Sequence, residues 1–377
     1  MDVSVGIVGL PNAGKSTLFN ALLGRSVANT APYAFCTIEP NVGVVEVKDE
    51  HLDQLAEVLN PKEKIPAAIE FVDIAGLVKG AHEGEGLGNE FLSHIRNVDV
   101  VLHLVRAFEG EGVERVGGAD PAEDLQTVNT ELLLKDLERI SKFQIQSAGR
   151  RTKFQKGNVN KRETIKKRAV EKVSKVLEEG RLAVEAKLTE EEEEAIEDLN
   201  LLTMKPQLVV ANIDEAAAGE APGASADLPA GKAGLAPEAE ECGSLSSAIP
   251  ICAKLEEDLA DFTPEERKEY LEGVCISESA LDKVIRGCYN LLELITFYTV
   301  KGGEIVRAWP IKKGSSVLRA AEIVHSDFAE NFIRAEVVQV QELIEAGSWL
   351  AAKEQGIIDV RGRDYIVHDS DVVEFKI

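Results

Sequence analysis

The sequence predicts an α/β protein in which a mostly parallel sheet carries an inserted helical arm and is followed by a small domain rich in strands. Over residues 3–129, short apolar runs alternate with longer mixed segments, a pattern typical of buried parallel strands separated by helices. Residues 128–204 contain no proline and follow a helical pattern almost throughout. Residues 294–377 return to the alternation that indicates strands.

Composition and charge exclude several classes of protein. The 377 residues leave room for two or three domains of roughly 150 residues each. A formal net charge of −24 excludes a uniformly basic nucleic-acid-binding surface, favours a monomer, and still permits a local basic patch. We expect no sequence-specific DNA binding. The five cysteines are scattered, no basic leader is present, and no apolar run reaches the ~18 residues of a membrane span. We therefore expect a cytoplasmic protein without membrane attachment.

The first domain is built from five apolar runs that are expected to form its sheet: 3–8, 69–72, 98–105, 207–211 and 249–252. Helical patterns cover residues 17–23 and 264–294. Because the last two runs follow the helical region, the domain comprises residues 1–127 and 206–293, interrupted by an arm at 128–205.

The arm has segregated charges. Residues 150–175 carry eleven Lys and Arg against two acids, whereas residues 178–198 are dominated by acids, including a run of five glutamates at 190–194. Two antiparallel, coiled-coil-like helices of opposite charge would bring these stretches side by side. The alternative for the acidic run is a solvated helical face.

Two further regions follow the arm. Residues 216–243 are rich in Ala, Gly and Pro and cannot bury enough apolar surface to form a core, so they are interpreted as a mobile insertion. Residues 294–377 predict a small α+β domain with two helices, 316–325 and 343–353. Its expected strands are 295–300, 304–310, 332–340, 357–360, 365–367 and 372–377.

A phosphate-binding loop is the strongest motif in the chain. Residues 9–17, Gly-Leu-Pro-Asn-Ala-Gly-Lys-Ser-Thr, match G-x-x-x-x-G-K-S between a predicted strand and a predicted helix. Backbone amides in such a loop surround a phosphate at the positive end of a helix. Lys15 would neutralise β- and γ-phosphate oxygens, and Ser16 would bind Mg²⁺. A chance glycine-rich turn would lack the flanking strand and helix.

Two elements downstream fit a nucleotide switch. Asp73 and Gly76 form a D-x-x-G motif after an apolar strand, so Asp73 would hold Mg²⁺ through a water and the Gly76 amide would contact the γ-phosphate. Thr37 is the candidate for closing on Mg²⁺ when the γ-phosphate is present. Without the loop at 9–17, Thr37 would be interpreted as a turn residue before Pro40.

The group that activates water is not evident. Leu77 occupies the position of the glutamine that orients water in related GTPases, and it cannot form a hydrogen bond. Hydrolysis is therefore expected to be slow or to use another group. Asn12 is one candidate, because an asparagine there can help recruit a monovalent cation. His82, in a glycine-rich loop, is another, although a surface histidine fits the pattern equally well.

The base-binding motif favours adenine. Guanine recognition uses Asn-Lys-x-Asp, whereas residues 212–215 read Asn-Ile-Asp-Glu. Ile213 replaces the lysine that covers the base, and Glu215 is one methylene longer than the guanine-binding aspartate. Residues 252–254, Cys-Ala-Lys, resemble the loop that completes the base pocket. The alternative for Asn212 is a turn cap.

Taken together, these motifs resemble those of the Obg-like ATPases of the YchF type. The matching segments are residues 9–17, 35–41, 73–89 and 212–215. Three segments of the last domain, 306–309, 325–328 and 332–337, resemble the TGS domain, a ubiquitin-like β-grasp fold.

The resemblance implies an ATPase with the fold of a P-loop GTPase domain, dependent on Mg²⁺ and often K⁺, that associates with ribosomes. The ribosomal partner would be the large subunit or the 70S particle, contacted through the helical arm and the TGS domain. By position, the triphosphate is bound by Asn12, Ala13, Gly14, Lys15, Ser16 and Thr17. Ser16 and Thr37 would bind magnesium, and Ile213 would contact adenine.

The chain departs from the family at two places. Arg115 stands where the family usually has a histidine proposed to be catalytic, so activation would rely on Arg115 itself or on K⁺. Residues 216–243 are unlike the helix that usually follows the base motif.

Three functions remain open at this point. The first is a slow ATPase switch that changes its affinity for the ribosome. The second is a GTPase of the Obg class acting in ribosome assembly, which Ile213 and Glu215 disfavour. The third is a binding module that uses nucleotide only as a structural ligand, which Leu77 and Arg115 leave open.

Overall fold

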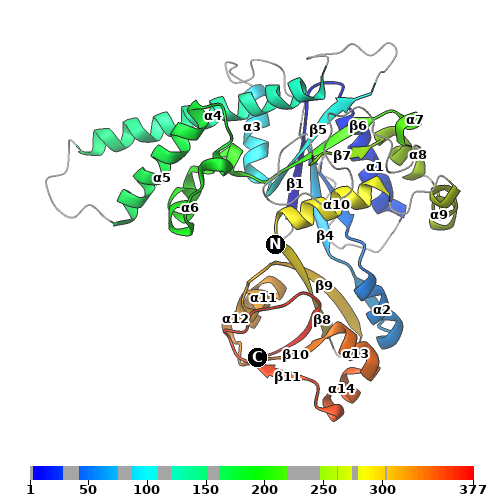
Figure 1. Ribbon diagram of the computed structural model, residues 1–377. Coiled ribbons are helices and arrows are strands. Elements are labelled where there is room, and N and C mark those ends of the chain that lie inside the picture. The colour runs from blue at the N-terminus through cyan, green and yellow to red at the C-terminus, as the bar shows by residue number, and fades with distance from the viewer. Residues whose placement is uncertain are drawn as a thin grey trace.

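Two sheets and a helical arm make up the computed structural model (Figure 1). The arm extends from one side of the first sheet domain, and the C-terminal domain lies below that domain in this view. The structure describes residues 3–28, 42–74, 87–108, 120–151, 161–218, 247–260, 262–273, 279–301 and 304–377.

The first sheet has the order β2-β4-β1-β5-β6-β7, and all neighbours are parallel except β2 with β4. This confirms the predicted fold class, including each of the five apolar runs as a strand. All seven residues of β6 are buried, as expected for a strand covered on both faces. The strands are β1 (Val3–Val8), β2 (Val42–Glu46), β4 (Ala68–Asp73), β5 (Val100–Ala107), β6 (Gln207–Ile213) and β7 (Ile249–Ile251).

Helices cover both faces of this sheet. On one face, Leu18 and Leu22 of α1 and Val284 of α10 share a core with β1 and β5. On the other face, Leu92 of α3 and Val128 of α4 pack on the sheet. The helices are α1 (Lys15–Ala28), α3 (Leu87–Asn97), α4 (Pro121–Arg151), α7 (Glu215–Ala218), α8 (Ala253–Ala260), α9 (Pro264–Gly273) and α10 (Ala280–Leu291).

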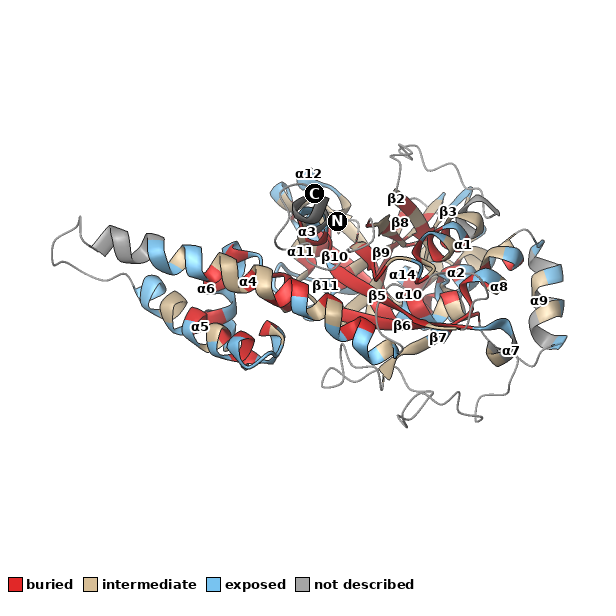
Figure 2. Ribbon diagram, turned by 90° about the horizontal axis from the view of Figure 1, so that it is seen from above, coloured by how far each residue is buried: buried red, intermediate tan, exposed pale blue. Residues whose placement is uncertain are grey.

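The arm is a helical hairpin whose core lies between α4 and α5 (Lys161–Glu178), closed by α6 (Glu190–Ile196) and three short 3-10 turns. Figure 2 shows its buried residues on the inner sides of these helices. The helix was expected from residue 128, but α4 begins at Pro121, because proline is favoured in the first helical turn. The 3-10 turns are Ala183–Ala186, Glu197–Leu199 and Leu202–Met204.

Both interpretations of the acidic run hold in part. Glu192 is 4 % exposed and pairs with Lys172 at 2.6 Å and with Arg168 at 3.4 Å. Asp198 pairs with Lys166. The remaining glutamates of the run 190–194 are exposed. Opposite charges therefore meet between α5 and α6, and one side of the acidic helix is solvated.

The C-terminal domain has a second sheet, ordered β11-β10-β12-β8-β9-β3. Its strands are β8 (Leu294–Lys301), β9 (Ile305–Lys312), β10 (Arg334–Gln339), β11 (Asp359–Arg361) and β12 (Asp371–Lys376), together with β3 (Glu63–Ile65). Its helices are α11 (Val317–Val324), α12 (Ser326–Glu330), α13 (Val340–Ala346) and α14 (Trp349–Gln355).

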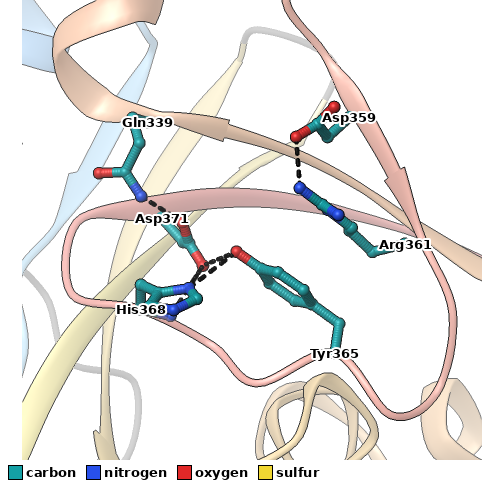
Figure 3. Close-up of polar contacts among 6 residues, drawn as sticks. All are labelled: Gln339, Asp359, Arg361, Tyr365, His368 and Asp371. Atoms are coloured by element: carbon teal, nitrogen blue, oxygen red, sulfur yellow. Dashed lines mark hydrogen bonds and ion pairs between the residues drawn. The ribbon is translucent and has the colours of Figure 1, made fainter.

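The segment 365–367, expected to be a strand, forms only an isolated bridge between Ile366 and Ser316. The Tyr365 hydroxyl donates instead to the buried carboxylate of Asp371 at 2.9 Å, and Asp371 also accepts from the His368 amide and from Gln339 (Figure 3). Burial raises the pKa of Asp371, and these donors offset part of that cost. Two backbone bonds flank the bridge, from the Val317 amide to the Tyr365 carbonyl at 2.7 Å and from the Val367 amide to the Ser315 carbonyl at 3.0 Å. One antiparallel bridge and these side-chain bonds, not a longer strand ladder, therefore hold this segment.

A segment of the N-terminal half belongs to the second sheet. β3 pairs in parallel with β9, and α2 (Glu50–Leu59) buries Leu52 and Leu55 in the core of the C-terminal domain. The Tyr298 hydroxyl donates to Asp49, the N-cap of α2, at 2.7 Å. The sequence analysis assigned residues 1–127 entirely to the first domain and did not include β3 and α2 in the second. Strands that pair across more than 200 residues leave no local sequence pattern.

Candidate functional site

The loop after β1 has the shape of a phosphate cradle. Gly14 has a φ of 96°, and a Cβ there would lie 2.3 Å from the Asn212 Nδ2 atom. A Cβ on Gly9 would lie 2.4 Å from the Leu104 carbonyl oxygen. Asn12 also has positive φ, 62°, which asparagine tolerates better than most residues. Glycine is therefore required at both positions, because neighbouring atoms leave no room for a Cβ. The loop leads directly into α1.

Lys15 is held inside this loop. Its side chain is 8 % exposed, and its Nζ atom donates to the Leu10 carbonyl at 2.9 Å. Burial lowers the pKa of Lys15, and the negative charge of Asp73 partly opposes that effect. A phosphate next to the ammonium group would supply the counter-charge that burial makes favourable.

Ser16 and Asp73 come together as predicted from the sequence. The parallel pairing of β1 with β4 places Asp73 opposite Ile7, and the Ser16 hydroxyl donates to Asp73 Oδ2 at 3.2 Å. Asp73 Oδ1 is buried and has no hydrogen-bond partner among the described residues. Burial raises the pKa of Asp73. A hydroxyl beside a carboxylate with a spare buried oxygen is a donor set that fits Mg²⁺.

Asn212 ties the loop to the neighbouring strand end. Its Nδ2 atom donates to the Ala13 carbonyl at 2.9 Å, and its Oδ1 atom accepts from the Ala253 amide at 3.0 Å. Both ends of this 7 % exposed amide are therefore used within the protein. The structure thus gives Asn212 a positioning role between the phosphate loop and residues 252–254.

The predicted base-binding residues lie at the same edge of the sheet. Ile213 ends β6 and is 9 % exposed, and the exposed Glu215 opens α7. Burial raises the pKa of Cys252, with a smaller contribution from the nearby charge of Glu215. The structure therefore gathers the loop, Asp73, Ile213 and Glu215 at the carboxyl ends of parallel strands, where α/β sheets bind ligands.

Comparison with known proteins decides the family. The chain is 43 % identical over 378 residues to the ribosome-binding ATPase YchF of Bacillus subtilis, covering 100 % of this chain and 99 % of that protein. The chain belongs to the YchF family. The YchF protein of Haemophilus influenzae is 41 % identical, with the same coverage.

The remaining comparisons agree with YchF membership. The solved structure of the Schizosaccharomyces pombe YchF GTPase superposes with a TM-score of 0.81 at 33 % identity, covering 100 % of this chain and 98 % of that one. A family model described as a 50S ribosome-binding GTPase matches residues 4–144. The YchF-GTPase C-terminal model, described as a protein of unknown function, matches residues 294–377.

Several predicted residues of this YchF-family chain lie outside the described residues. They are Thr37, Gly76, Leu77, His82 and Arg115. Most of the 216–243 segment also lies outside them, with only residues 216–218 described, as part of α7. The roles expected for these residues stay predictions.

Sequence reasoning missed two polar residues that this chain buries beside the site. His103 of β5 is 1 % exposed and pairs in the sheet with Val8, and its pKa is lowered to about 3 by burial and then by the charge of Lys15. Arg106 is 5 % exposed, lies opposite Asn212 in the sheet, and stacks over the Phe108 ring at 4.6 Å. A histidine and an arginine within an otherwise apolar strand were the available signal.

Replacing Asn212 by alanine is expected to lower the free energy of unfolding by about 2 kcal/mol or more, because the Ala13 carbonyl and the Ala253 amide would lose their partner. Urea unfolding measures the change. Asn20 is the matched control, since its side chain bonds Glu257 in an exposed position. Its replacement by alanine should change stability by no more than about 0.5 kcal/mol. Equal effects at the two asparagines would contradict the positioning role of Asn212.

Proposed function

We propose that this chain is a magnesium-dependent ATPase that binds the ribosome, acting as a slow nucleotide switch. The observation that carries the proposal is the arrangement of Lys15, Ser16 and Asp73 at the carboxyl end of the first sheet. The relatives named ribosome-binding ATPase YchF, which match the chain from end to end, support it.

The roles of the residues follow from their surroundings. The backbone of the loop and the start of α1 bind the triphosphate, over Asn12, Ala13, Gly14, Lys15, Ser16 and Thr17. The buried ammonium of Lys15 binds phosphate oxygens, which add counter-charge to that of Asp73. Ser16 and Asp73 hold Mg²⁺, together with Thr37 when the γ-phosphate is present. When bound, the metal stabilises negative charge on the phosphates.

The choice of nucleotide depends on the end of β6. In this proposal Ile213 supplies an apolar contact to the base, and Glu215 accepts a hydrogen bond from the amino group of adenine. Asn212 contributes by holding the phosphate loop against residues 252–254. The group that assists hydrolysis is expected among Gly76, His82, Arg115 and a K⁺ ion recruited by Asn12.

Ribosome binding is assigned to the arm and to the C-terminal domain, with the large subunit or the 70S particle as partner. We interpret the C-terminal domain as a TGS domain of the β-grasp type, and the chain as a cytoplasmic monomer. None of the helices in the described part of the chain is both long and apolar enough to cross a membrane.

Phosphate release with ATP and with GTP, each in K⁺ and in Na⁺, tests the proposed activity. We expect faster release with ATP and stimulation by K⁺, with Lys15→Ala as the blank. Preference for GTP would mean that Glu215 reaches guanine and would move the chain to the GTPase alternative. Co-sedimentation with ribosomes, with ATP and with ADP, tests the partner. A protein that pellets with ribosomes neither with ATP nor with ADP would contradict ribosome binding.

A further inference from the structure

Residues 47–67 leave the first domain, pack into the C-terminal domain and return, and we call them the linking segment. They follow β2 and precede β4, and both of these strands belong to the first sheet. Figure 1 shows α2 of this segment beside the C-terminal domain, below the first sheet. The Val47 amide donates to the Ala67 carbonyl at 2.8 Å, and Val47 packs against the cores of both domains. The chain therefore enters and leaves the C-terminal domain at one place.

The linking segment is bound to the C-terminal domain by several kinds of contact. β3 pairs with β9 over three residues. Leu52 and Leu55, at most 1 % exposed, belong to the core of that domain. The buried Tyr298 hydroxyl donates to Asp49, and its oxygen lies 2.7 and 2.9 Å from the two carboxylate oxygens. Asp49 also caps α2 by accepting from the Leu52 amide at 3.1 Å. Because a hydrogen bond to a carboxylate is one of the stronger kinds, we expect the segment to move with the C-terminal domain.

The strand that leaves the linking segment ends at the proposed metal site. β4 starts directly after the buried Ala67 and ends at Asp73, whose carboxylate accepts from Ser16. It has a paired strand on each side, β1 and β2. Its six residues span roughly 20 Å, and an extended strand cannot lengthen further. A shift of the C-terminal domain along β4 therefore either moves Asp73 or breaks the pairing of the first sheet.

A second connection restricts the C-terminal domain. α10 ends at Leu291, and β8 begins at Leu294, which packs against the core of the first domain. Tyr289 of α10 and Thr296 of β8 share a hydrogen bond at 2.9 Å between their hydroxyls. The C-terminal domain is thus held at two places, by the linking segment and by the start of β8, and it is not a freely tethered module.

We propose that the linking segment positions the metal site, with Tyr298 and Asp49 as positioning residues, so that the C-terminal domain sets the affinity for Mg²⁺ and nucleotide. The inference rests on the proposed function, because that function assigns Asp73 to Mg²⁺. Tyr298 acts through the linking segment and β4. By linkage the coupling is reciprocal: bound nucleotide changes the C-terminal domain, and a partner on that domain changes nucleotide affinity by the same factor.

Tryptophan fluorescence can report this coupling, because both tryptophans of the chain, Trp309 and Trp349, lie in the C-terminal domain. Arg307, the register partner of Ile65 in β3, stacks over the Trp309 ring at 3.9 Å. Trp349 packs against the core that contains α2. Titration of the full-length protein with Mg²⁺ and ATP should therefore give a saturable change in tryptophan emission. The same titration of Lys15→Ala, which should bind nucleotide poorly, is the blank.

Tyr298→Phe tests the positioning contact, because it removes one hydroxyl and keeps the ring. Its matched control is Tyr365→Phe, which loses a hydrogen bond to the buried Asp371 inside the C-terminal domain and outside the linking segment. We expect Tyr298→Phe to lower the affinity for ATP in Mg²⁺ by about fivefold or more and to reduce the emission change at saturating nucleotide. The control variant should match wild type. Calorimetry measures the affinities.

A milder variant keeps the test decisive if Tyr298→Phe affects folding, which thermal melting of each variant monitors. Asp49→Asn retains a good cap for α2 and removes the charge that accepts from Tyr298. It should lower nucleotide affinity in the same direction by a smaller factor. An equal loss of affinity in Tyr298→Phe and Tyr365→Phe, or unchanged affinity in folded Tyr298→Phe and Asp49→Asn, would overturn the inference.

The wild-type titration separates this inference from the proposed function. Nucleotide that binds by calorimetry and leaves the tryptophan emission unchanged would overturn the coupling, while the proposed ATPase would stand. Wild-type protein that binds neither ATP nor ADP in Mg²⁺ would overturn the proposed function, and the coupling with it. A saturable emission change with the same midpoint as the calorimetric titration supports both.

Discussion

Replacing Lys15 by alanine should reduce ATP hydrolysis by roughly 10²–10³-fold, because one preorganised cationic donor to the phosphates is lost. Lys15 is buried and directed by the Leu10 carbonyl, so no described residue can take over its position without rebuilding the loop. Nucleotide affinity should fall in parallel. Phosphate release and titration with a fluorescent ATP analogue measure the two effects.

Lys15→Met is the control that separates charge from volume. Burial lowers the pKa of Lys15, which means that the folded protein disfavours its charge at neutral pH. Without nucleotide, the methionine variant is therefore expected to melt at or above the wild-type temperature, although it is inactive. Hydrolysis at the wild-type rate by this variant would contradict the role of the ammonium group.

Acidification should destabilise the chain through His103. The pKa of this buried histidine is about 3 in the fold, against an ordinary value of 6.5. Between these values the unfolded chain binds a proton that the folded chain does not, so the free energy of unfolding falls as the pH drops below 6.5. At about 1.4 kcal/mol per pKa unit, the loss reaches about 4–5 kcal/mol near pH 3.

His103→Phe should remove this part of the pH dependence, because a ring of similar size remains and the titrating group is gone. Urea unfolding gives the free energy of unfolding at pH 7 and at pH 5. Its decrease between these two pH values should be about 2 kcal/mol smaller for the variant than for wild type. Replacement of the exposed His94 by glutamine is the control for losing a histidine. If wild type and His103→Phe show the same pH dependence, the lowered pKa of the buried His103 is contradicted.

Much of the molecule could be predicted from local patterns. The strand–loop–helix setting of residues 9–17 predicted a cradle that the structure shows around Lys15. The apolar runs predicted the sheet, and the motifs assigned Ser16 and Asp73 to the same metal ion; the two side chains lie within hydrogen-bond distance, at 3.2 Å. These features depend on residues that are adjacent in sequence, or on the rule that the carboxyl ends of parallel strands lie at the same edge of a sheet.

Other features have no local signature. Nothing near residues 50–65 indicates that Leu52 and Leu55 pack into a core formed by the last 84 residues, from 294 to 377. The base motif pointed Asn212 at a nucleotide, whereas its amide bridges Ala13 and Ala253. The acidic run could have been solvated or paired, and only the packing of α6 on α5 shows that Glu192 pairs while its neighbours do not.

Sequence alone therefore determined the motifs of this protein: a phosphate loop, a serine and an aspartate that are predicted to bind a metal, and a family whose motifs extend over the whole chain. Periodicity and short spacings encode those features, because backbone geometry is local. Tertiary structure decided which polar side chains meet. It placed His103 beside Lys15, and it placed the Asn212 amide between Ala13 and Ala253, because such contacts join distant segments through burial and charge.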